Sequence, residues 1–260
     1  MMLLLLHNTL SAVYGDNAVE CDLNHLSATC LMPAVTSQTA VVSWEDRWLV
    51  VRFSVPHRML SWAIVGGGFR TATAVAWRQV TDAELSIEVE PRALLTEALE
   101  RADLSGAVGL LTSSSLAHAV TTSGDVEDLH VQCLATIGLS NALRVGDPAG
   151  AEGVHVGTIN VCVWLSRALT DEALVEAQAL CTEARTLAML QANVPSIVSG
   201  LPATGTGTDC QVVAAPVDGK PLSFVGKHTA AGHLIGAVVT QAISTGVARW
   251  IAENGDPRRT

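Results

Sequence analysis

One segment of the chain, DEALVEAQALCTEARTLAMLQ at residues 171–191, is apolar over nearly the whole circumference of the helix that it predicts. Thr170 is the expected N-cap, and the two acidic residues that follow it suit the positive end of the helix dipole. A helix that is apolar nearly all round is buried, so other elements must cover it on more than one side. We therefore expect the carboxylate of Glu183 to be desolvated and to need a partner or a chemical role.

Strands and two further helices supply this cover. Alternating or continuous apolar runs predict a hairpin around residues 45–47 and buried strands within residues 106–112, 128–138, 155–166 and 212–215. Apolar periodicity predicts helices over residues 91–104 and from about residue 228 to residue 252, the second capped by Thr229 and followed by Gly255.

This order of elements predicts the fold class. Strands dominate early in the chain and alternate with helices later, which is typical of an α/β or α+β domain with helices packed over a mixed sheet. No internal repeat or linker divides the body of the chain. We expect residues 41–260 to form a single domain and residues 1–40 to form a poorly structured or peripheral lead-in.

Composition limits the classes of partner. The chain has 260 residues, 49% of them hydrophobic, and a formal net charge of −10. It has no Lys/Arg cluster that would follow a nucleic-acid backbone, so we expect no nucleic-acid partner. No apolar run reaches the roughly 18 residues of a membrane span, and we expect a cytoplasmic protein.

The six cysteines are scattered without a CxxC pair, which favours small buried side chains over zinc or disulfide sites.

The segment ATGTGTDCQVVAAP, at residues 203–216, is the strongest candidate for chemistry. Alternating threonines and glycines run directly into Asp209 and an apolar strand, whereas a simple turn needs only one or two such residues. Backbone N–H groups and hydroxyls in such a loop can bind an anion or a developing oxyanion. Asp209 could orient a nucleophile, act as a base or bind a metal. The competing interpretation is a tight bend whose hydroxyls only cap local backbone.

Other polar features are weaker signals. His228 precedes a helix, where a structural role is more common than a catalytic one. The glycines at residues 66–68 lack the spacing of a dinucleotide fingerprint, and the serines at residues 113–115 lack the GxSxG pattern. The six tryptophans could wall a large flat ligand, although core packing is the default expectation for each.

Several distinctive blocks stand in order along the chain: LSWAIVGGGFRTA, ATIGLSNALRVGDPA, GTIN, TEARTLAML and ATGTGTDCQVVA. Over residues 41–248 this pattern resembles the adenosylcobinamide amidohydrolase family. The resemblance implies hydrolysis of the amide that joins aminopropanol to a propionate side chain of the corrin ring. The products would be adenosylcobyric acid, which re-enters cobalamin synthesis, and aminopropanol. The chain departs from the expected pattern at Arg185, where TEAR replaces TEAK.

The resemblance agrees with the candidate residues. Amide hydrolysis passes through a tetrahedral oxyanion, which needs preorganised donors and an activated nucleophile. The nucleophile is left open between a threonine hydroxyl and a water activated by a carboxylate, and the second is slightly favoured because no histidine adjoins the threonines in sequence. The predicted catalytic residues are Asp209, Glu183, Thr206 and Thr208. The predicted substrate-binding residues are Thr204, Gly205, Gly207, Ser140, Asn141, Arg144, Asn160 and His228.

The sequence does not decide between the possible cofactors and oligomeric states. No cofactor is certain, and the cobalt would belong to the corrinoid substrate. If a divalent metal takes part, its predicted ligands are Glu183, Asp209 and His228. The last helix could form core or a dimer face, which leaves a homo-oligomer open. The alternatives to an amidohydrolase are a corrinoid-binding protein without catalysis and an amidase for an unrelated small amide.

Overall fold

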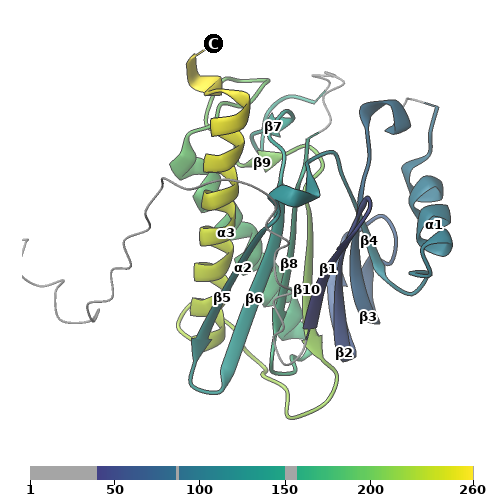
Figure 1. Ribbon diagram of the computed structural model, residues 1–260. Coiled ribbons are helices and arrows are strands. Elements are labelled where there is room, and N and C mark those ends of the chain that lie inside the picture. The colour runs from purple at the N-terminus through teal and green to yellow at the C-terminus, as the bar shows by residue number, and fades with distance from the viewer. Residues whose placement is uncertain (1–39, 86–87, 150–156, 260) are drawn as a thin grey trace, which may run out of the picture. The chain divides into compact units, whose positions relative to one another are not determined.

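The computed structural model describes residues 40–85, 88–149 and 157–259 (Figure 1). The predicted lead-in lies outside the described residues except for Ala40, so the division of the chain at residue 40 stays a prediction. Along the described chain the elements are β1 (Ala40–Glu45), β2 (Trp48–Ser61), β3 (Gly68–Gln79), η1 (Asp82–Leu85), α1 (Pro91–Arg101), β4 (Val108–Thr112), η2 (Leu116–His118), β5 (Val120–Val126), β6 (Leu129–Ile137), β7 (Ala142–Leu143), β8 (Ile159–Leu165), α2 (Asp171–Ala192), β9 (Gly205–Thr206), β10 (Cys210–Pro216), α3 (Ala230–Asn254) and η3 (Pro257–Arg259).

The strands form a mixed sheet, so the predicted fold class is confirmed. Its order is β4-β3-β2-β10-β8-β6-β5, and β1 pairs with β2. The β3–β4 and β10–β8 pairs are parallel, whereas the other pairs of this sheet are antiparallel. The short strands β7 and β9 pair with each other outside this sheet. The parallel β8 and β10 begin side by side, with Asn160 opposite Cys210, which brings two polar loops to one edge of the sheet.

The predicted hairpin and threonine caps are confirmed, whereas α1 ends at Arg101 instead of residue 104 and α3 spans Ala230–Asn254 instead of about residues 228–252. The β1–β2 turn passes through Asp46, whose φ of 50° is the left-handed conformation that a tight turn requires. Thr170 and Thr229 cap α2 and α3, each accepting a hydrogen bond from a backbone N–H of the first turn. Gly255 ends α3. The strand β5 and the pair β7–β9 were not predicted, because their segments are too short or too polar to show a period.

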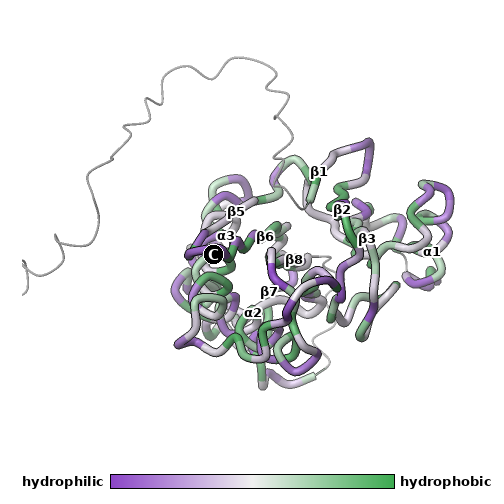
Figure 2. The backbone as a smooth tube through the Cα atoms, turned by 90° about the horizontal axis from the view of Figure 1, so that it is seen from below, coloured by the Kyte–Doolittle hydropathy of each residue, from purple (hydrophilic) through white to green (hydrophobic). Residues whose placement is uncertain are grey.

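Helices α2 and α3 pack against each other and against the half of the sheet that contains β5, β6, β8 and β10. Viewed along the strands, they lie together at this half, and α1 lies beyond β3 at the other (Figure 2). Helix α3 is the one described helix that is long and apolar enough to cross a membrane by length and composition. Its apolar residues are nevertheless core residues of this packing, namely Leu234, Ile235, Val238, Val239 and Ile243. The apolar residues of α3, for which the sequence allowed either a core or a dimer face, therefore belong to the core.

The expectation that α2 is buried all round is wrong. Val175 and Leu187 are 53% and 49% exposed, and the side chain of Glu183 between them is 55% exposed. The sheet and α3 cover two sides of the helix, and this third stripe faces outward. Exposed apolar side chains are common enough on protein surfaces that the sequence pattern alone could not separate this stripe from the core.

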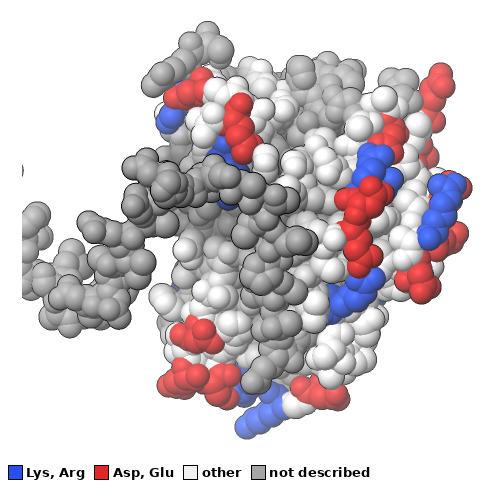
Figure 3. Space-filling model, in the orientation of Figure 1, with Lys and Arg blue, Asp and Glu red and all other residues white. Residues whose placement is uncertain are grey.

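The opposite face of the sheet carries a second apolar cluster, with Trp77 and Trp164 fully buried within it. The cysteines within the described residues are free and buried, as predicted: Cys133, Cys162, Cys181 and Cys210. On the surface shown in Figure 3, the described Lys and Arg side chains lie beside Asp and Glu and form no basic patch.

Candidate active site

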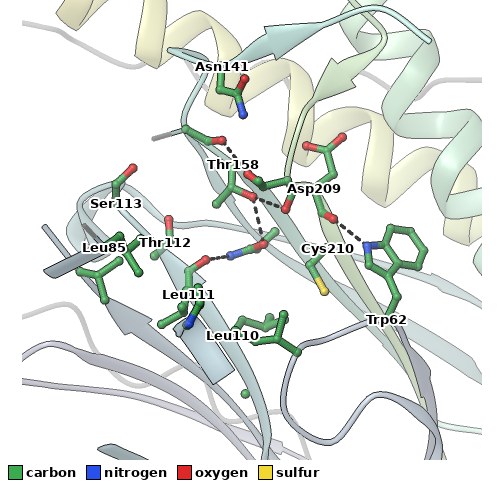
Figure 4. A pocket seen from close by; sticks show the side chains of 17 residues that line it. Trp62, Leu85, Leu110, Leu111, Thr112, Ser113, Asn141, Thr158, Asp209 and Cys210 are labelled. Atoms are coloured by element: carbon green, nitrogen blue, oxygen red, sulfur yellow. Dashed lines mark hydrogen bonds between the residues drawn. The ribbon is translucent and has the colours of Figure 1, made fainter. Parts of the chain in front are cut away.

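A cavity of about 310 Å³ opens where β4 ends and where β8 and β10 begin (Figure 4). One wall is apolar and is formed by side chains such as Ile64, Leu85 and Leu110. The other wall is polar and contains Thr158, Asn160 and Thr208. Further lining residues are Trp62, Val80, Pro91, Gly109, Leu111, Thr112, Ser113, Asn141, Gly157, Asp209 and Cys210. An apolar cavity with a few convergent polar groups is the usual form of a small-molecule site.

Hydrogen bonds hold the polar wall together. The Thr158 hydroxyl donates to the Thr208 carbonyl at 2.8 Å, and the Thr208 hydroxyl donates to the Gly157 carbonyl at 2.9 Å. The buried Asn160 side chain donates to the Leu111 carbonyl at 2.7 Å, which ties β8 to β4 across the cavity. Three side chains that can donate or accept are thus fixed at one end of an otherwise apolar space.

Asp209 organises the loop behind this wall. Its carboxylate is 8% exposed and accepts hydrogen bonds from Arg185 Nη1 at 2.5 Å, Thr206 N at 3.0 Å and Ile159 N at 3.3 Å. The Thr206 hydroxyl also donates to it. Burial raises the pKa of Asp209, and the charge of Arg185 and the Thr206 hydrogen bonds oppose that rise. The Asp209 carbonyl accepts from Trp62 Nε1 at 2.6 Å, and the carboxylate points away from this indole (Figure 4).

Close packing explains why glycine alternates with threonine in this loop. A Cβ at Gly205 would stand 2.1 Å from Asp209 Oδ2, and a Cβ at Gly207 would stand 2.7 Å from Asn141 Nδ2. Neither approach leaves room for a side chain. The loop is therefore closely packed, and the groups packed against its glycines are the side chains of Asp209 and Asn141.

The backbone donors of the loop are largely engaged within the protein. Thr204 N donates to the Leu143 carbonyl at 2.9 Å, and Gly207 N donates to the Asn141 carbonyl at 3.1 Å. Thr206 N donates to Asp209. In this conformation these three N–H groups are not available to an oxyanion, contrary to the expectation that the loop itself is an open anion cradle.

The predicted catalytic residues lie in different places. Thr208 and Asp209 line the cavity, although the Asp209 carboxylate is committed to Arg185. The Thr206 hydroxyl is bound to that same carboxylate and does not line the cavity. Glu183 lies on the exposed stripe of α2 and pairs with Lys227 Nζ at 2.5 Å, so its predicted desolvation is wrong.

The predicted substrate-binding residues divide in the same way. Asn141 and Asn160 line the cavity, and Ser140 lines a neighbouring cleft. Arg144 Nη1 donates to the Pro202 carbonyl at 2.7 Å, and the Thr204 hydroxyl accepts from Val145 N at 2.8 Å, so both stabilise the loop.

His228 and the predicted metal ligands do not converge. His228 precedes the first turn of α3, a 25-residue helix about 37 Å long. Within the described residues there is no group of three or more His, Cys, Asp or Glu side chains that could hold a metal ion. The structure therefore does not bring Glu183, Asp209 and His228 together as a ligand set.

Several site residues escaped the sequence-based prediction. Thr158 lies in the GTIN block, but one threonine before a strand carries no signal of its own. Trp62 was indistinguishable from the other tryptophans, yet it is 48% exposed at the cavity whereas Trp77 and Trp164 are buried. Ser113 follows β4 and was not selected because its surroundings lack the GxSxG pattern, yet it lines the cavity.

Comparison with known proteins identifies the family. The family model described as adenosylcobinamide amidohydrolase matches residues 32–255, which is most of the chain. The chain belongs to this family. The amidohydrolase motifs quoted above all fall within the match, including the loop at residues 203–209 that carries Asp209.

The individual proteins that resemble this chain have low sequence identity to it. "Uncharacterized protein MJ1613" of Methanocaldococcus jannaschii is 28% identical over 153 residues, which are 52% of this chain and 60% of that protein. The chain thus spans about 60% of the length of the curated relative that it matches.

Among solved structures, the PH0078 protein of Pyrococcus horikoshii has a TM-score of 0.39 at 12% identity and is covered over 83% of both chains. The L-aminopeptidase D-Ala-esterase/amidase of Ochrobactrum anthropi has a TM-score of 0.39 at 12% identity over 80% of this chain and 82% of that one. A Burkholderia β-aminopeptidase has a TM-score of 0.36 at 13% identity over 78% of both.

Proposed function

We propose that this protein hydrolyses the amide that joins aminopropanol to the corrin ring of adenosylcobinamide. Water adds to the amide carbon, the C–N bond breaks, and the leaving nitrogen takes a proton. The products are adenosylcobyric acid and aminopropanol, for use in cobalamin salvage. The observation that carries the proposal is the family match over residues 32–255, which includes both loops of the polar cavity wall.

The size of the cavity indicates which part of the substrate it accepts. At about 310 Å³ it is at the lower limit of ligand pockets, which span about 300–1,000 Å³, and it is too small for a corrin ring with its side chains. We therefore assign the cavity to the amide-linked arm. The ring would remain outside against Trp62, whose indole is exposed and whose orientation is fixed by its bond to the Asp209 carbonyl.

The polar wall supplies the groups that would contact the scissile amide. Thr208 is the one predicted threonine whose residue lines the cavity. Its hydroxyl and that of Thr158 now donate to backbone carbonyls, and a hydroxyl rotates readily toward a new acceptor. Asp209 acts through the loop: its hydrogen bonds from Thr206 N and Ile159 N fix the loop that carries Thr208 and the residue that follows Thr158. In this proposal Asp209 is a positioning residue.

A second candidate is a corrinoid-binding protein without catalysis. One observation favours it: the Asp209 carboxylate is paired with Arg185 and points away from Trp62, so it is already engaged within the protein and is not placed to activate water beside that indole (Figure 4). The same cavity and the same exposed indole would then only hold the ligand.

Incubation with adenosylcobinamide, with and without a chelator, separates these functions. Mass spectrometry is expected to show a corrinoid lighter by aminopropanol with water added, together with free aminopropanol. Intact substrate in both arms despite measurable binding would favour the carrier, and no binding would favour an unrelated amide. Thr208→Val is expected to lose at least about 100-fold in kcat if its hydroxyl contacts the reacting amide. Thr121→Val, on the exposed side of β5, is the matched control.

A further inference from the structure

A second cleft, of about 400 Å³, adjoins the cavity and is polar in character. It lies between the C-terminal end of α3, the loop after β4 and the end of β6. In Figure 1 this end of α3 lies at the same edge of the sheet as β7 and β9. The residues that matter for the argument are Ser114, Ser115, Ser140, Arg249, Trp250 and Glu253. The amide cavity does not account for any of them.

The two spaces are adjacent and share lining residues. Ser113 lines both, and the consecutive residues Ser140 and Asn141 line the cleft and the cavity respectively. Gly157, which also lines the cavity, packs so closely against them that a Cβ there would stand 2.9 Å from the backbone nitrogens of both Ser140 and Asn141. One ligand with two protruding groups can therefore reach both spaces.

The charged groups of the cleft have hydrogen-bond partners within the protein. His118 Nδ1 pairs with Glu253 Oε2 at 3.0 Å, and Arg249 Nη1 donates to the His118 carbonyl at 3.1 Å. Within the described residues, the hydroxyls of Ser114, Ser115 and Ser140 take part in no hydrogen bond. The cleft therefore presents the three serine hydroxyls beside the indole of Trp250, and its charged lining residues Arg249 and Glu253 carry one formal charge of each sign. A lining without net formal charge suits a neutral, hydroxyl-rich ligand with a flat ring better than an anion.

We propose that this cleft binds the adenosine group of the substrate, a nucleoside without phosphate, while the amide-linked arm occupies the cavity. Trp250 offers an aromatic surface to the base, because nucleobases stack on indole rings without needing charge. The serine hydroxyls would bond the ribose and the base edge. This inference rests on the proposed function, since it places a second part of the same molecule.

The test compares substrates with and without the nucleoside. Trp250→Leu keeps an apolar side chain against the core, and the double variant Ser115→Ala/Ser140→Ala removes only hydroxyls. Each is expected to raise KM for adenosylcobinamide about tenfold with kcat retained, and to leave KM for cyanocobinamide unchanged. Gln241→Leu is the control, because Gln241 is exposed on α3 and lines neither the cavity nor the cleft. Equal changes for both substrates, or no change for either, would overturn the proposal.

A direct measurement separates failure of this site from failure of the proposed function. Equilibrium dialysis with labelled adenosine is expected to show binding to the full chain and to Gln241→Leu, and loss of binding in both cleft variants. If no corrinoid is hydrolysed, the proposed function fails, yet adenosine bound through Trp250 would still support the cleft. Absence of adenosine binding, or equal binding by all variants, would reject it.

Discussion

Helix α2 carries two ion pairs of the same length in opposite surroundings. Arg185 Nη1 and Asp209 Oδ2 are 2.5 Å apart, as are Glu183 Oε2 and Lys227 Nζ. The side chains of the first pair are 11% and 8% exposed, and those of the second are 55% and 72% exposed. Distance therefore says nothing about the role of either pair, whereas burial and the additional hydrogen bonds of Asp209 do.

The difference in burial indicates which ion pair orders the loop at residues 204–209. A buried ion pair contributes little net stability relative to apolar residues, but removal of one partner leaves an uncompensated buried charge. An exposed pair gains little because water and salt screen it. The first pair is thus a specific constraint on the loop at residues 204–209, and the second is a surface feature.

The largest effect is expected from breaking the buried pair. Arg185→Met should lower the free energy of unfolding by about 3–5 kcal/mol, because it leaves the Asp209 carboxylate buried without its counter-charge. Urea unfolding measures this directly. Arg185→Lys, which restores the residue of the TEAK pattern, keeps the charge and should recover most of the loss. A loss in the lysine variant equal to that in Arg185→Met would show that the guanidinium geometry, rather than the charge, holds the loop.

The next effect concerns the glycine beside this pair. Gly205→Ala should destabilise by about 1–3 kcal/mol, because its Cβ would stand 2.1 Å from Asp209 Oδ2 and 3.2 Å from Arg185 Cζ. Substrate turnover should fall with it, since the displaced loop carries Thr208.

The control is Gly106→Ala, where a Cβ would meet no atom within 4 Å. Thermal unfolding of the two variants should therefore separate clearly. Equal melting temperatures would contradict the close packing seen at Gly205.

Much of the fold was predictable, and much of the site was not. The β1–β2 hairpin, the three helices and the threonine caps of α2 and α3 follow from local periodicity and capping. The loop at residues 203–209 was correctly singled out, because its composition is excessive for a turn. Its role was not predictable, since only the fold shows that Gly205 makes room for Asp209 and that Asp209 faces Arg185.

Glu183 is a residue whose surroundings the sequence predicted incorrectly. An amphipathic pattern distinguishes a polar stripe from an apolar one, but the exposed stripe of α2 contains Val175 and Leu187 as well as Glu183. No periodicity reveals that such a stripe faces solvent. The polar wall of the cavity could not be predicted from the sequence either, because Thr158 and Thr208 meet only through the parallel pairing of β8 and β10.

A third ion pair lies between the two extremes. Arg47 and Glu84 are each 32% exposed, and their hydrogen bond with the added contribution of Thr81 N lowers the pKa of Glu84 to about 2. Because the folded-state pKa is depressed, the contribution to stability is present above the unfolded pKa near 4.5 and is lost as the pH falls through about 2.

The corresponding variant is Glu84→Gln. It should lose about 1 kcal/mol at pH 7, a value reduced by solvent screening, and should match the parent chain near pH 2. Urea unfolding across this range measures the difference. A difference that does not change with pH would mean that Glu84 acts through its shape or its neutral hydrogen bonds.

The smallest effect is expected at the exposed pair of α2. Glu183→Gln should change the free energy of unfolding by less than about 0.5 kcal/mol, and should leave turnover of adenosylcobinamide unchanged, because both side chains of the pair are mainly in water. A double-mutant cycle with Lys227→Met should give a coupling energy near zero, against several kcal/mol for the cycle of Arg185 with Asp209. A large loss of turnover in Glu183→Gln with unchanged stability would restore Glu183 as a catalytic residue. It would also imply that the loop carrying Lys227 moves when substrate binds, since the carboxylate does not line the cavity in this conformation.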